Sequence, residues 1–527
     1  MKLAIQQDEL FETPINLKEK IESRRSKELV IAFISPIGSG LPHIINTFSE
    51  KLEERGYEKV EIIKLSALLK KFKEKTSINF NGTENFKRYR ELQEAGKVLR
   101  ERTQNHAILA EYAASAITIS RERIISEDDD NKIKKIAYLI DQIKRPEEVE
   151  LLRAIYRNNF YLVGITRSKN ERGESLKKES ILETEVTQLM ETDRNENDKN
   201  GQKVDKALHL SDFFINNSLN YSSETGGQVN RFLGLLHGEK HITPLIDEMG
   251  MYAAYMAGLK SACLSRQVGA SIATQEGEII STGCNDVPKF GGGLYFEGTS
   301  PDSRCMHQEG SECHNDKHKN QIKKNIEKIV NEELNIAKKS NTDLDKHLNT
   351  ELINDIKIKI IEKIQKETRI GSLIEFSRAV HAEMDAIISL ARIGGSSVKN
   401  TTLYSTTFPC HNCARHIVTA GIKRVVYIEP YEKSLALDLH ADSISFDQKI
   451  TDTNNKVNFS HFSGVAPHRF HFLFHSNERK DDSGKFIKIR KYDEVKKLPE
   501  YLDSYMVFEK KAVENFQITY NSVVDTE

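Results

Sequence analysis

Short, uninterrupted apolar runs alternate with amphipathic stretches through the first 235 residues. The run Leu29–Ile34 is followed by an amphipathic segment from Pro42 to Leu52. An unbroken apolar run predicts a parallel strand that is covered on both faces. Comparable runs predict further strands at residues 60–63, 136–140, 161–164 and 213–215, with helices between them. The pattern indicates a doubly wound α/β domain with a parallel sheet over residues 1–235.

The second half of the chain carries another alternation of predicted helices and strands. A helix begins near His381 and continues through residues 386–391, and a strand follows at 402–406. Residues 414–420 predict a second helix that ends at Gly421, before a buried strand at 425–428. A chain of 527 residues is expected to hold two or three domains. We therefore assign residues 236–527 to a second domain.

Two charged stretches interrupt these patterns. Residues 167–206 are rich in charge and include an almost wholly polar run at 193–201, which is typical of a solvated lid or loop. Residues 310–370 combine charge with apolar residues at helical spacing, such as Ile326, Ile329 and Val330. This spacing predicts a helical hairpin inserted in the second domain. A partner surface is one interpretation of the hairpin, and a solvated excursion is the simpler one.

Composition bounds the class of protein. The chain is 38% hydrophobic and has a net charge of −1, so ordinary cores are expected and a broad nucleic-acid-binding surface is not. It contains no run of 18 apolar residues and no apolar N-terminal signal, so neither a membrane helix nor secretion is expected. Six cysteines in a chain of this kind indicate a reducing compartment. A cytoplasmic location is the expectation that follows.

The strongest chemical signal is a motif at residues 381–413. His381 and Glu383 are followed by Pro409, Cys410 and Cys413. Two thiolates and one imidazole can hold zinc and leave its fourth position for water, whose pKa then falls to about 7. Glu383 can move protons at that water without being a ligand. The spacing is the signature of zinc deaminases that act on nucleobases, and it predicts hydrolytic deamination of a cyclic amidine. A structural zinc site would need a fourth protein ligand and gives no reason for Glu383 or Pro409.

A second group of soft ligands occurs at residues 305–318. Cys305, His307, Cys313 and His314 lie within ten residues of one another, and His318 follows closely. Such a density can hold a structural zinc ion, although the spacing matches no standard zinc finger. Ordinary loop cysteines are the simpler interpretation.

The first predicted strand leads into a glycine-rich turn at residues 35–40. A strand, a glycine-rich turn and a helix together suggest a phosphate-binding loop. Its nucleotide contacts would be Ser35, Gly38, Ser39 and Gly40. Asp141, at the end of another predicted strand, could hold magnesium near the phosphates. The motif is degenerate, because Leu41 and Pro42 stand where a full motif has Lys and Ser or Thr. Nucleotide binding and simple packing both remain open, and we expect this domain to regulate rather than to catalyse.

Beyond the zinc motif, several segments make the chain similar to a known family, the bacterial antiphage deoxycytidylate deaminases. These segments are residues 141–150, 210–216, 265–270, 430–440 and 464–467. The resemblance implies an N-terminal P-loop kinase-like domain and a C-terminal cytidine-deaminase-like α/β/α domain. It implies conversion of dCTP and dCMP to dUTP and dUMP, which would deplete dCTP during phage replication. Some members are held inactive by a co-encoded small RNA, a partner that only the resemblance suggests. A homo-oligomer is also expected.

The resemblance further suggests a substrate pocket. Asn285 matches a family position that contacts a sugar hydroxyl, although an Asn-Asp turn before proline is an alternative interpretation. The backbone N–H of Ala382 and the carboxylate of Glu383 are expected to read the edge of the base. Tyr404 and Tyr431 are candidate walls of the pocket, and a place in the core is the alternative interpretation of either. Candidate phosphate contacts are Arg266, Lys433 and Arg469.

Two other functions are alternatives to deamination of free nucleotides. A polynucleotide deaminase, acting on cytosine or adenine in tRNA or single-stranded DNA, would use the same zinc chemistry. It would need a basic channel with stacking aromatic residues, which a net charge of −1 and an aromatic content of 8% do not favour. A non-enzymatic sensor with a decayed site is disfavoured because the motif at residues 381–413 is intact.

Overall fold

The computed structural model describes most of the chain and divides it into two compact units. The first unit consists of Met1–Glu248 together with His461–Glu527, and the second of Met249–Ser460. The described residues are 24–74, 78–126, 134–195, 198–218, 222–340, 350–368, 370, 373–431, 434–446, 455–476, 478–489 and 497–524. Within these ranges, no helix combines the length and the apolar character needed to cross a membrane.

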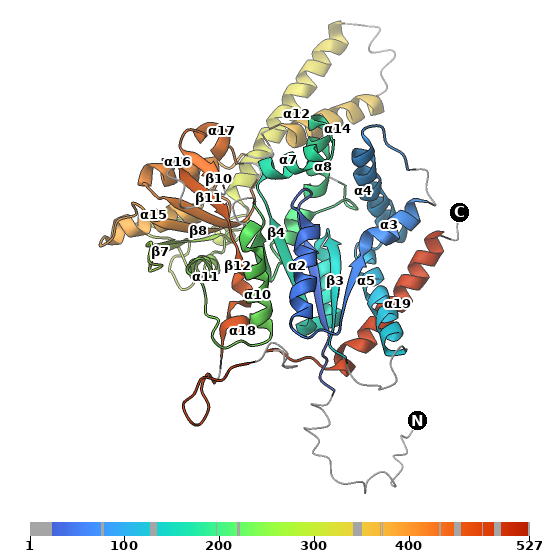
Figure 1. Ribbon diagram of the computed structural model, residues 1–527. Coiled ribbons are helices and arrows are strands. Elements are labelled where there is room, and N and C mark those ends of the chain that lie inside the picture. The colour runs from blue at the N-terminus through green and yellow to red at the C-terminus, as the bar shows by residue number, and fades with distance from the viewer. Residues whose placement is uncertain are drawn as a thin grey trace, which may run out of the picture. The chain divides into compact units, whose positions relative to one another are not determined.

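The first unit is built on a six-stranded sheet in the order β12-β5-β4-β1-β3-β2 (Figure 1). Five strands are parallel: β1 (Leu29–Ile34), β2 (Lys59–Lys64), β3 (Ile136–Ile143), β4 (Phe160–Thr166) and β5 (Phe213–Asn216). The edge strand β12 (Gly464–Val465) is antiparallel to β5. All five strands predicted in this region are confirmed. Strand β3 continues past its predicted end and therefore contains Asp141.

Helices cover both faces of this sheet, which explains why β1 is apolar throughout. Leu29, Ile31 and Phe33 of β1 join the core beneath α2 (Leu41–Glu53) and α10 (Thr225–Leu236). The alternate residues of β1 face the opposite side and are equally buried. Helices that pack against one another on that side include α3 (Leu65–Lys73), α5 (Ile108–Ser126), α6 (Pro146–Tyr156) and α19 (Leu502–Val524). The remaining long helix, α4 (Glu84–Thr103), packs against α3.

The charged stretch at residues 167–206 is not the solvated loop that its composition predicted. It forms α7 (Lys169–Lys178), α8 (Glu183–Asn195) and α9 (Val204–Leu208). A separate core cluster unites this region with the turn after β1 and with α4, through Ile37, Phe86, Leu176, Ile181, Val186, Leu189 and Met190. The prediction was wrong because a narrow apolar stripe, with Val186, Leu189 and Met190 at helical spacing, is enough to bury a helix that is otherwise charged.

The C-terminal segment belongs to the first unit, so the unit limits differ from the predicted domain limits of 1–235 and 236–527. Helix α19 packs against α5, and a buried ion network joins them. Arg121 of α5 lies 2.6 Å from Glu28 and 2.5 Å from Glu509 of α19, measured between guanidinium nitrogen and carboxylate oxygen. Tyr505 also donates to Glu28 at 2.7 Å. Because all four side chains are buried, each charge depends on its partners.

A second set of contacts holds the C-terminal segment to the first sheet, and it centres on Asp212, which precedes β5. Its carboxylate accepts a hydrogen bond from the Leu162 N–H at 2.7 Å and lies 3.2 Å from the guanidinium of Arg469. Burial alone would raise the pKa of Asp212. The hydrogen bond from His468 and the charges of Arg153 and Arg469 nevertheless hold that pKa below its usual value. The carboxylate therefore fastens residues 468–469 to the sheet in its ionised form.

The second unit is built on another six-stranded sheet, in the order β10-β11-β9-β8-β6-β7. Its strands are β6 (Gly269–Ala273), β7 (Ile279–Cys284), β8 (Thr402–Thr407), β9 (Arg424–Glu429), β10 (Ile444–Phe446) and β11 (Val457–His461). Strand β6 is antiparallel to β7 and β8, whereas β8 and β9 are parallel. The predicted strands at 402–406 and 425–428 are confirmed.

Different helices cover the two faces of the second sheet. The helices α15 (Ala382–Ile393) and α16 (His411–Ala420) share a core with Ala270, Ile272 and Leu403. The helix α11 (Ile246–Gly258) lies on the opposite face, where Ser271 donates a hydrogen bond to the Gly250 carbonyl. Short helices follow at α17 (Ala436–His440) in this unit and α18 (Phe470–Phe474) in the first. In the predicted insertion, α12 (His314–Ser340) and α14 (Thr350–Glu367) pack against each other (Figure 1).

Candidate metal centre and catalytic site

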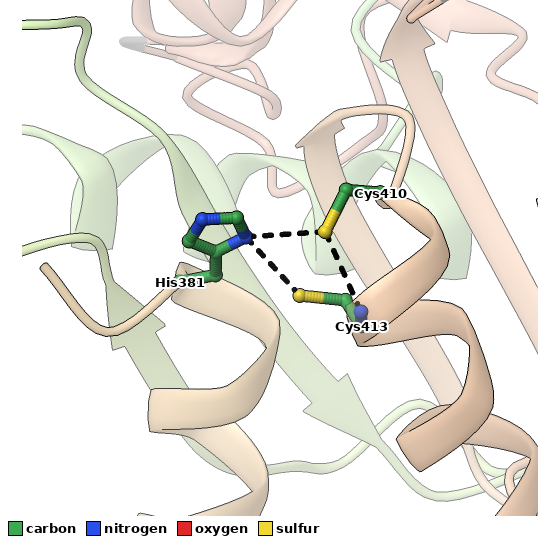
Figure 2. Close-up of side chains that lie close together, drawn as sticks. All are labelled: His381, Cys410 and Cys413. Atoms are coloured by element: carbon green, nitrogen blue, oxygen red, sulfur yellow. Dashed lines mark hydrogen bonds between the residues drawn. The ribbon is translucent and has the colours of Figure 1, made fainter. Parts of the chain in front are cut away.

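Three predicted zinc ligands converge where α15 and α16 begin. His381 is the N-cap residue of α15 and Cys410 that of α16, while Cys413 lies in the first turn of α16. His381 Nδ1 is 3.4 Å from Cys410 Sγ and 3.3 Å from Cys413 Sγ (Figure 2). Within the described ranges, this is the one group of three or more His, Cys, Asp or Glu residues whose ligand atoms lie within 4.8 Å of one another. Tetrahedral zinc with ordinary bond lengths separates a nitrogen from a sulfur ligand by about 3.6 Å. The side chains therefore fit a zinc ion.

The electrostatics of the cluster favour a thiolate at Cys410. Its sulfur accepts hydrogen bonds from the Cys413 side chain and, at the N-terminus of α16, from the Cys413 N–H at 3.5 Å, and the His381 ring lies beside it. These contacts lower the pKa of Cys410 to about 4. The hydrogen bond between His381 and Cys410 raises the pKa of His381 to about 9. The hydrogen bond between Cys413 and Cys410 raises the pKa of Cys413 well above its ordinary value. A thiolate at a helix N-terminus is the protonation state that binds a metal cation.

Glu383 adjoins the cluster without joining the ligand set. Its Oε2 accepts from Cys413 Sγ at 3.5 Å, and its side chain is only 4% exposed. Burial raises the pKa of Glu383 above its usual value, despite the nearby His381. A buried carboxyl with a raised pKa, in the first turn of the helix that follows His381, is suited to take up and release a proton.

Strand β7 fixes the start of α15 through contacts that the sequence did not reveal. A Cβ atom on Gly283 would lie 2.3 Å from the Ala382 carbonyl oxygen, so the helix backbone rests directly on the strand. Ser281 Oγ donates to the Ala386 carbonyl at 2.7 Å, and the Cys284 N–H donates to Asp385 at 3.1 Å. The available signal was the isolated glycine within a strand pattern, which often marks a close approach of two backbones.

A pocket of about 330 Å³ opens beside the cluster. His381 and Cys413 form part of its wall, so it reaches the predicted metal centre. Its other lining residues are Ile374, Glu375, Ser377, Ala379, Val380, Met384, Ile388, Asn412 and His416. The volume lies at the lower end of the range typical of small-molecule sites, about 300–1,000 Å³. None of these other residues was a predicted substrate contact.

Asn285 shapes the loop that carries Arg266. Its Oδ1 accepts from the Val268 N–H at 2.7 Å, and its Nδ2 donates to the Arg266 carbonyl at 2.8 Å. The Arg266 guanidinium lies 3.5 Å from the Glu429 carboxylate at the end of β9. Tyr431 follows two residues later, and its pKa is raised by burial and then by the nearby Cys410. The structure thus brings Arg266 and Tyr431 to the same side as the cluster and gives Asn285 a role in holding the loop.

Of the other predicted contacts, Tyr404 faces away from the cluster. Tyr404 is 1% exposed and lies on the α11 face of the sheet, where a Cβ atom on Gly250 would overlap its ring. It is a core residue there because β8 alternates sides, and Leu403 faces the helices that carry the ligands. Arg469 lies in the first unit beside Asp212. Ala382 is fully buried at the first position of α15, and Lys433 lies outside the described residues.

The ligand atoms of the second group of soft ligands do not lie within 4.8 Å of one another in the described part of the chain. His307 lies 3.3 Å from Asp302, His314 forms a 2.9 Å hydrogen bond with Gln308, and His318 stacks on Phe376. Cys313 contacts Ser265 Oγ at 3.4 Å. Together with Cys305, these residues form no cluster of ligand atoms in the described part of the chain. Metal binding by this group stays a prediction, because Cys305, Cys313 and His314 line one small cavity.

The glycine-rich turn has the predicted strand, turn and helix around it. Gly38 and Gly40 adopt positive φ angles of 83° and 76°, and Gly40 is the N-cap residue of α2. Asp141 does not reach the turn through a hydrogen bond that the structure shows; burial raises its pKa, with Lys64 and Lys144 opposing. Its neighbour Gln142 does reach it, with Nε2 3.2 Å from Ser35 Oγ. Ser35 and Ser39 are both buried.

Comparison with known proteins places the similarity on the second unit. The family described as "Cytidine and deoxycytidylate deaminase zinc-binding region" matches residues 246–429, which include all three candidate ligands. The deoxycytidylate deaminase of Enterobacteria phage T2 is 47% identical over 55 residues, covering 10% of this chain and 29% of that protein. ComE operon protein 2 of Bacillus subtilis is 31% identical over 96 residues, covering 17% of this chain and 50% of that protein. The chain therefore spans half or less of the length of these relatives.

A solved structure shows a weaker likeness. The dCMP deaminase of cyanophage S-TIM5, in complex with dCMP and dUMP, is 18% identical, with a TM-score of 0.23. The match covers 42% of this chain and 100% of that one. A TM-score at this level carries no argument about the fold. What the comparisons show is a region of residues 246–429 that is similar to cytidine and deoxycytidylate deaminases.

Proposed function

We propose that the protein is a zinc-dependent hydrolase that deaminates free deoxycytidine nucleotides, converting dCTP, dCMP or both to the corresponding deoxyuridine nucleotides. The observation that carries the proposal is the cluster of His381, Cys410 and Cys413 with the buried carboxyl of Glu383 beside it. The similarity of residues 246–429 to deoxycytidylate deaminases supports the class of substrate.

The chain's own residues account for the proton movements of such a reaction. Zinc, when bound, supplies a Lewis acid that lowers the pKa of water. Glu383 Oε2 would accept one proton from the attacking water and pass it to the ring nitrogen; it would then accept the remaining hydroxyl proton and pass it to the departing amino group. The balance is cytosine plus water giving uracil plus ammonia. His381 and Cys410 hold fixed positions because each caps a helix.

Free nucleotides suit the site better than a polynucleotide. The pocket beside the cluster is about 330 Å³, the size of a site for one small molecule. Arg266 is half exposed and is proposed as a phosphate contact, together with Lys433. We propose that Asn285 contributes by positioning this loop, in addition to any contact with the sugar. Ala382 is proposed to read the base through its backbone N–H.

The wider role extends the same proposal. Conversion of dCTP to dUTP in the cytoplasm would deplete the precursor on which phage replication depends. The first unit is proposed to bind a nucleotide with magnesium at Ser35, Gly38, Ser39, Gly40 and Asp141, and to regulate the second unit. A homo-oligomer and an inhibitory small RNA complete the proposal, and both rest on the resemblance in sequence.

Ammonia release from a nucleotide panel tests the proposed function. Purified protein with measured zinc content is incubated separately with dCTP, dCMP, CTP, CMP, dATP, dGTP, dTTP and a cytosine-containing oligodeoxynucleotide. The expected result is ammonia and a deoxyuridine product from dCTP, dCMP or both, with little from the oligonucleotide. Deamination of the oligonucleotide at a matching rate would establish the polynucleotide alternative instead. No ammonia from any substrate, with zinc bound, would contradict the proposal.

A further inference from the structure

The glycine-rich turn of the first unit is closed by a carboxylate of the chain itself. Asp193, near the end of α8, accepts a hydrogen bond from the Ile37 N–H at 2.8 Å and is only 2% exposed. Lys144 Nζ lies 2.5 Å from the other carboxylate oxygen and 3.3 Å from the Ser35 carbonyl oxygen. An anion held by a turn N–H and a lysine has the chemistry of a bound phosphate.

Further cationic side chains surround the same turn. Arg167 Nη1 is 3.4 Å from the Gly38 carbonyl oxygen, and Arg172 Nη1 is 3.5 Å from that of Ile37. The guanidinium of Arg167 also lies 3.5 Å from Glu171. The side chains of Lys144 and Arg167 are 12% and 13% exposed, so these charges are largely shielded from water. Such cations bind phosphate oxygens more strongly than the neutral carbonyl groups that they contact.

The turn also occupies the place in the sheet where ligands bind. Strands β1 and β3 are parallel neighbours, and the turn follows β1 while Lys144 follows β3. The helix after β1, α2, joins the core on one face, whereas α6, after β3, packs with α5 on the other. Open α/β sheets bind ligands at the carboxyl ends of strands where connections diverge in this way. Ser39 Oγ, in this turn, is buried and has no hydrogen-bond partner in the described residues.

We propose that this turn, with Lys144, Arg167 and Arg172, is a binding site for the phosphates of a nucleotide or of pyrophosphate, and that Asp193 holds it shut by occupying the anion position. The proposal deepens the nucleotide-binding role proposed for the first unit and rests on it. It does not depend on deamination by the second unit. In this proposal, Lys144, Arg167 and Arg172 supply the positive charge that the missing lysine after Gly40 would provide.

Closure by Asp193 is coupled to the packing of α8. Ile37 belongs to the core cluster that contains Leu189 and Met190, one helical turn before Asp193. A phosphate that takes the Ile37 N–H must therefore displace the end of α8 from the turn. The apparent affinity for the ligand is reduced by the fraction of molecules in which this contact is open.

Binding of pyrophosphate and of ATP, each with magnesium, tests the proposal by titration calorimetry on the full chain. Replacement of Asp193 by Asn keeps an acceptor for the Ile37 N–H but removes the charge that pairs with Lys144. Asp193→Asn is expected to bind both ligands about tenfold more tightly than wild type, because the open fraction rises. Addition of Lys144→Ala should remove that gain. The matched control is Asp198→Asn, because Asp198 is a more exposed carboxylate paired with Lys97 at 3.2 Å.

Equal affinities of Asp193→Asn and Asp198→Asn, or a gain that survives Lys144→Ala, would overturn the proposal. Hydrogen exchange on the wild-type protein gives a test that needs no variant. Saturating pyrophosphate should slow exchange in residues 35–40 and speed it at the end of α8, and unchanged exchange in both segments would overturn the proposal too. Both readouts are independent of ammonia release, so failure of the proposed deaminase activity would leave them interpretable.

Discussion

Replacement of Gly283 by Ala tests whether β7 positions the catalytic helix. The added Cβ atom would lie 2.3 Å from the Ala382 carbonyl oxygen, 2.4 Å from the Ala386 nitrogen and 3.0 Å from its Cα. All three neighbours are backbone atoms of α15, so no side-chain rotation can relieve the overlap. The first turn of α15, which follows His381 and carries Glu383, must move instead.

The size of the effect follows from these distances. An ordinary carbon contact begins near 3.4 Å, so α15 must shift by roughly 1 Å. Overpacking of this kind costs about 1–3 kcal/mol of folding free energy. A displacement of about 1 Å at a catalytic group can lower the rate about 100-fold. We expect Gly283→Ala to lose deaminase kcat/KM by about that factor and to weaken zinc retention.

Three measurements on each variant check this prediction: kcat/KM for dCTP and dCMP, zinc content after dialysis, and the thermal unfolding midpoint. The matched control is Gly227→Ala in α10, where a Cβ atom has no neighbour within 4 Å. The control should be active and about as stable as wild type or slightly more stable, by up to about 1 kcal/mol. If Gly283→Ala binds zinc and turns over substrate as the control does, β7 does not set the position of α15 and the reasoning is refuted.

Three further predictions concern the metal centre and the ties of the C-terminal segment. Cys410→Ser should lose bound zinc and local stability together, measured by metal analysis and thermal unfolding, whereas Cys263→Ser should keep a full equivalent; equal zinc in both would exclude Cys410 as a ligand. Arg121→Met should cost about 3–5 kcal/mol in chemical unfolding because it leaves buried carboxylates unpaired, while the exposed Arg123→Met should cost under about 1 kcal/mol; similar losses would contradict this account. The lowered pKa of Asp212 means that its stabilising contribution is present above the unfolded-state pKa, about 4, and is lost as pH falls through the lower folded-state pKa. Asp212→Asn should therefore be less stable than wild type at pH 7, with the difference narrowing toward pH 3, and a constant difference would refute the assignment.

The parts of the fold that the sequence predicted are those in which the apolar residues follow one clear pattern. The fully apolar run at residues 29–34 predicted a strand covered on both sides, and this strand lies inside the first sheet, away from its edges. The helices after His381 and Pro409 were expected from the patterns at residues 386–391 and 414–420, and the structure confirms both. The spacing of His381, Cys410 and Cys413 likewise predicted a cluster that the structure shows.

The misinterpreted parts depend on contacts between distant segments. The charges of residues 167–206 concealed a short apolar stripe whose partner, Ile37, lies far away in the sequence. The return of α19 to the first unit depends on Arg121, which pairs with carboxylates far away on both sides in the chain. Tyr404 was a candidate pocket wall because the sequence did not show which face of β8 lies against the helices that carry the ligands.

The most direct test of the central claim measures ammonia release and bound zinc on the same samples of wild type and Glu383→Ala. Glu383 is adjacent to the ligands but is absent from the ligand group, so it is assigned proton transfer and not metal binding. The account predicts that wild type releases ammonia from a deoxycytidine nucleotide. It also predicts that Glu383→Ala keeps one equivalent of zinc while losing at least about 100-fold in rate. Equal rates at equal zinc content, or loss of zinc along with activity in Glu383→Ala, would contradict that assignment.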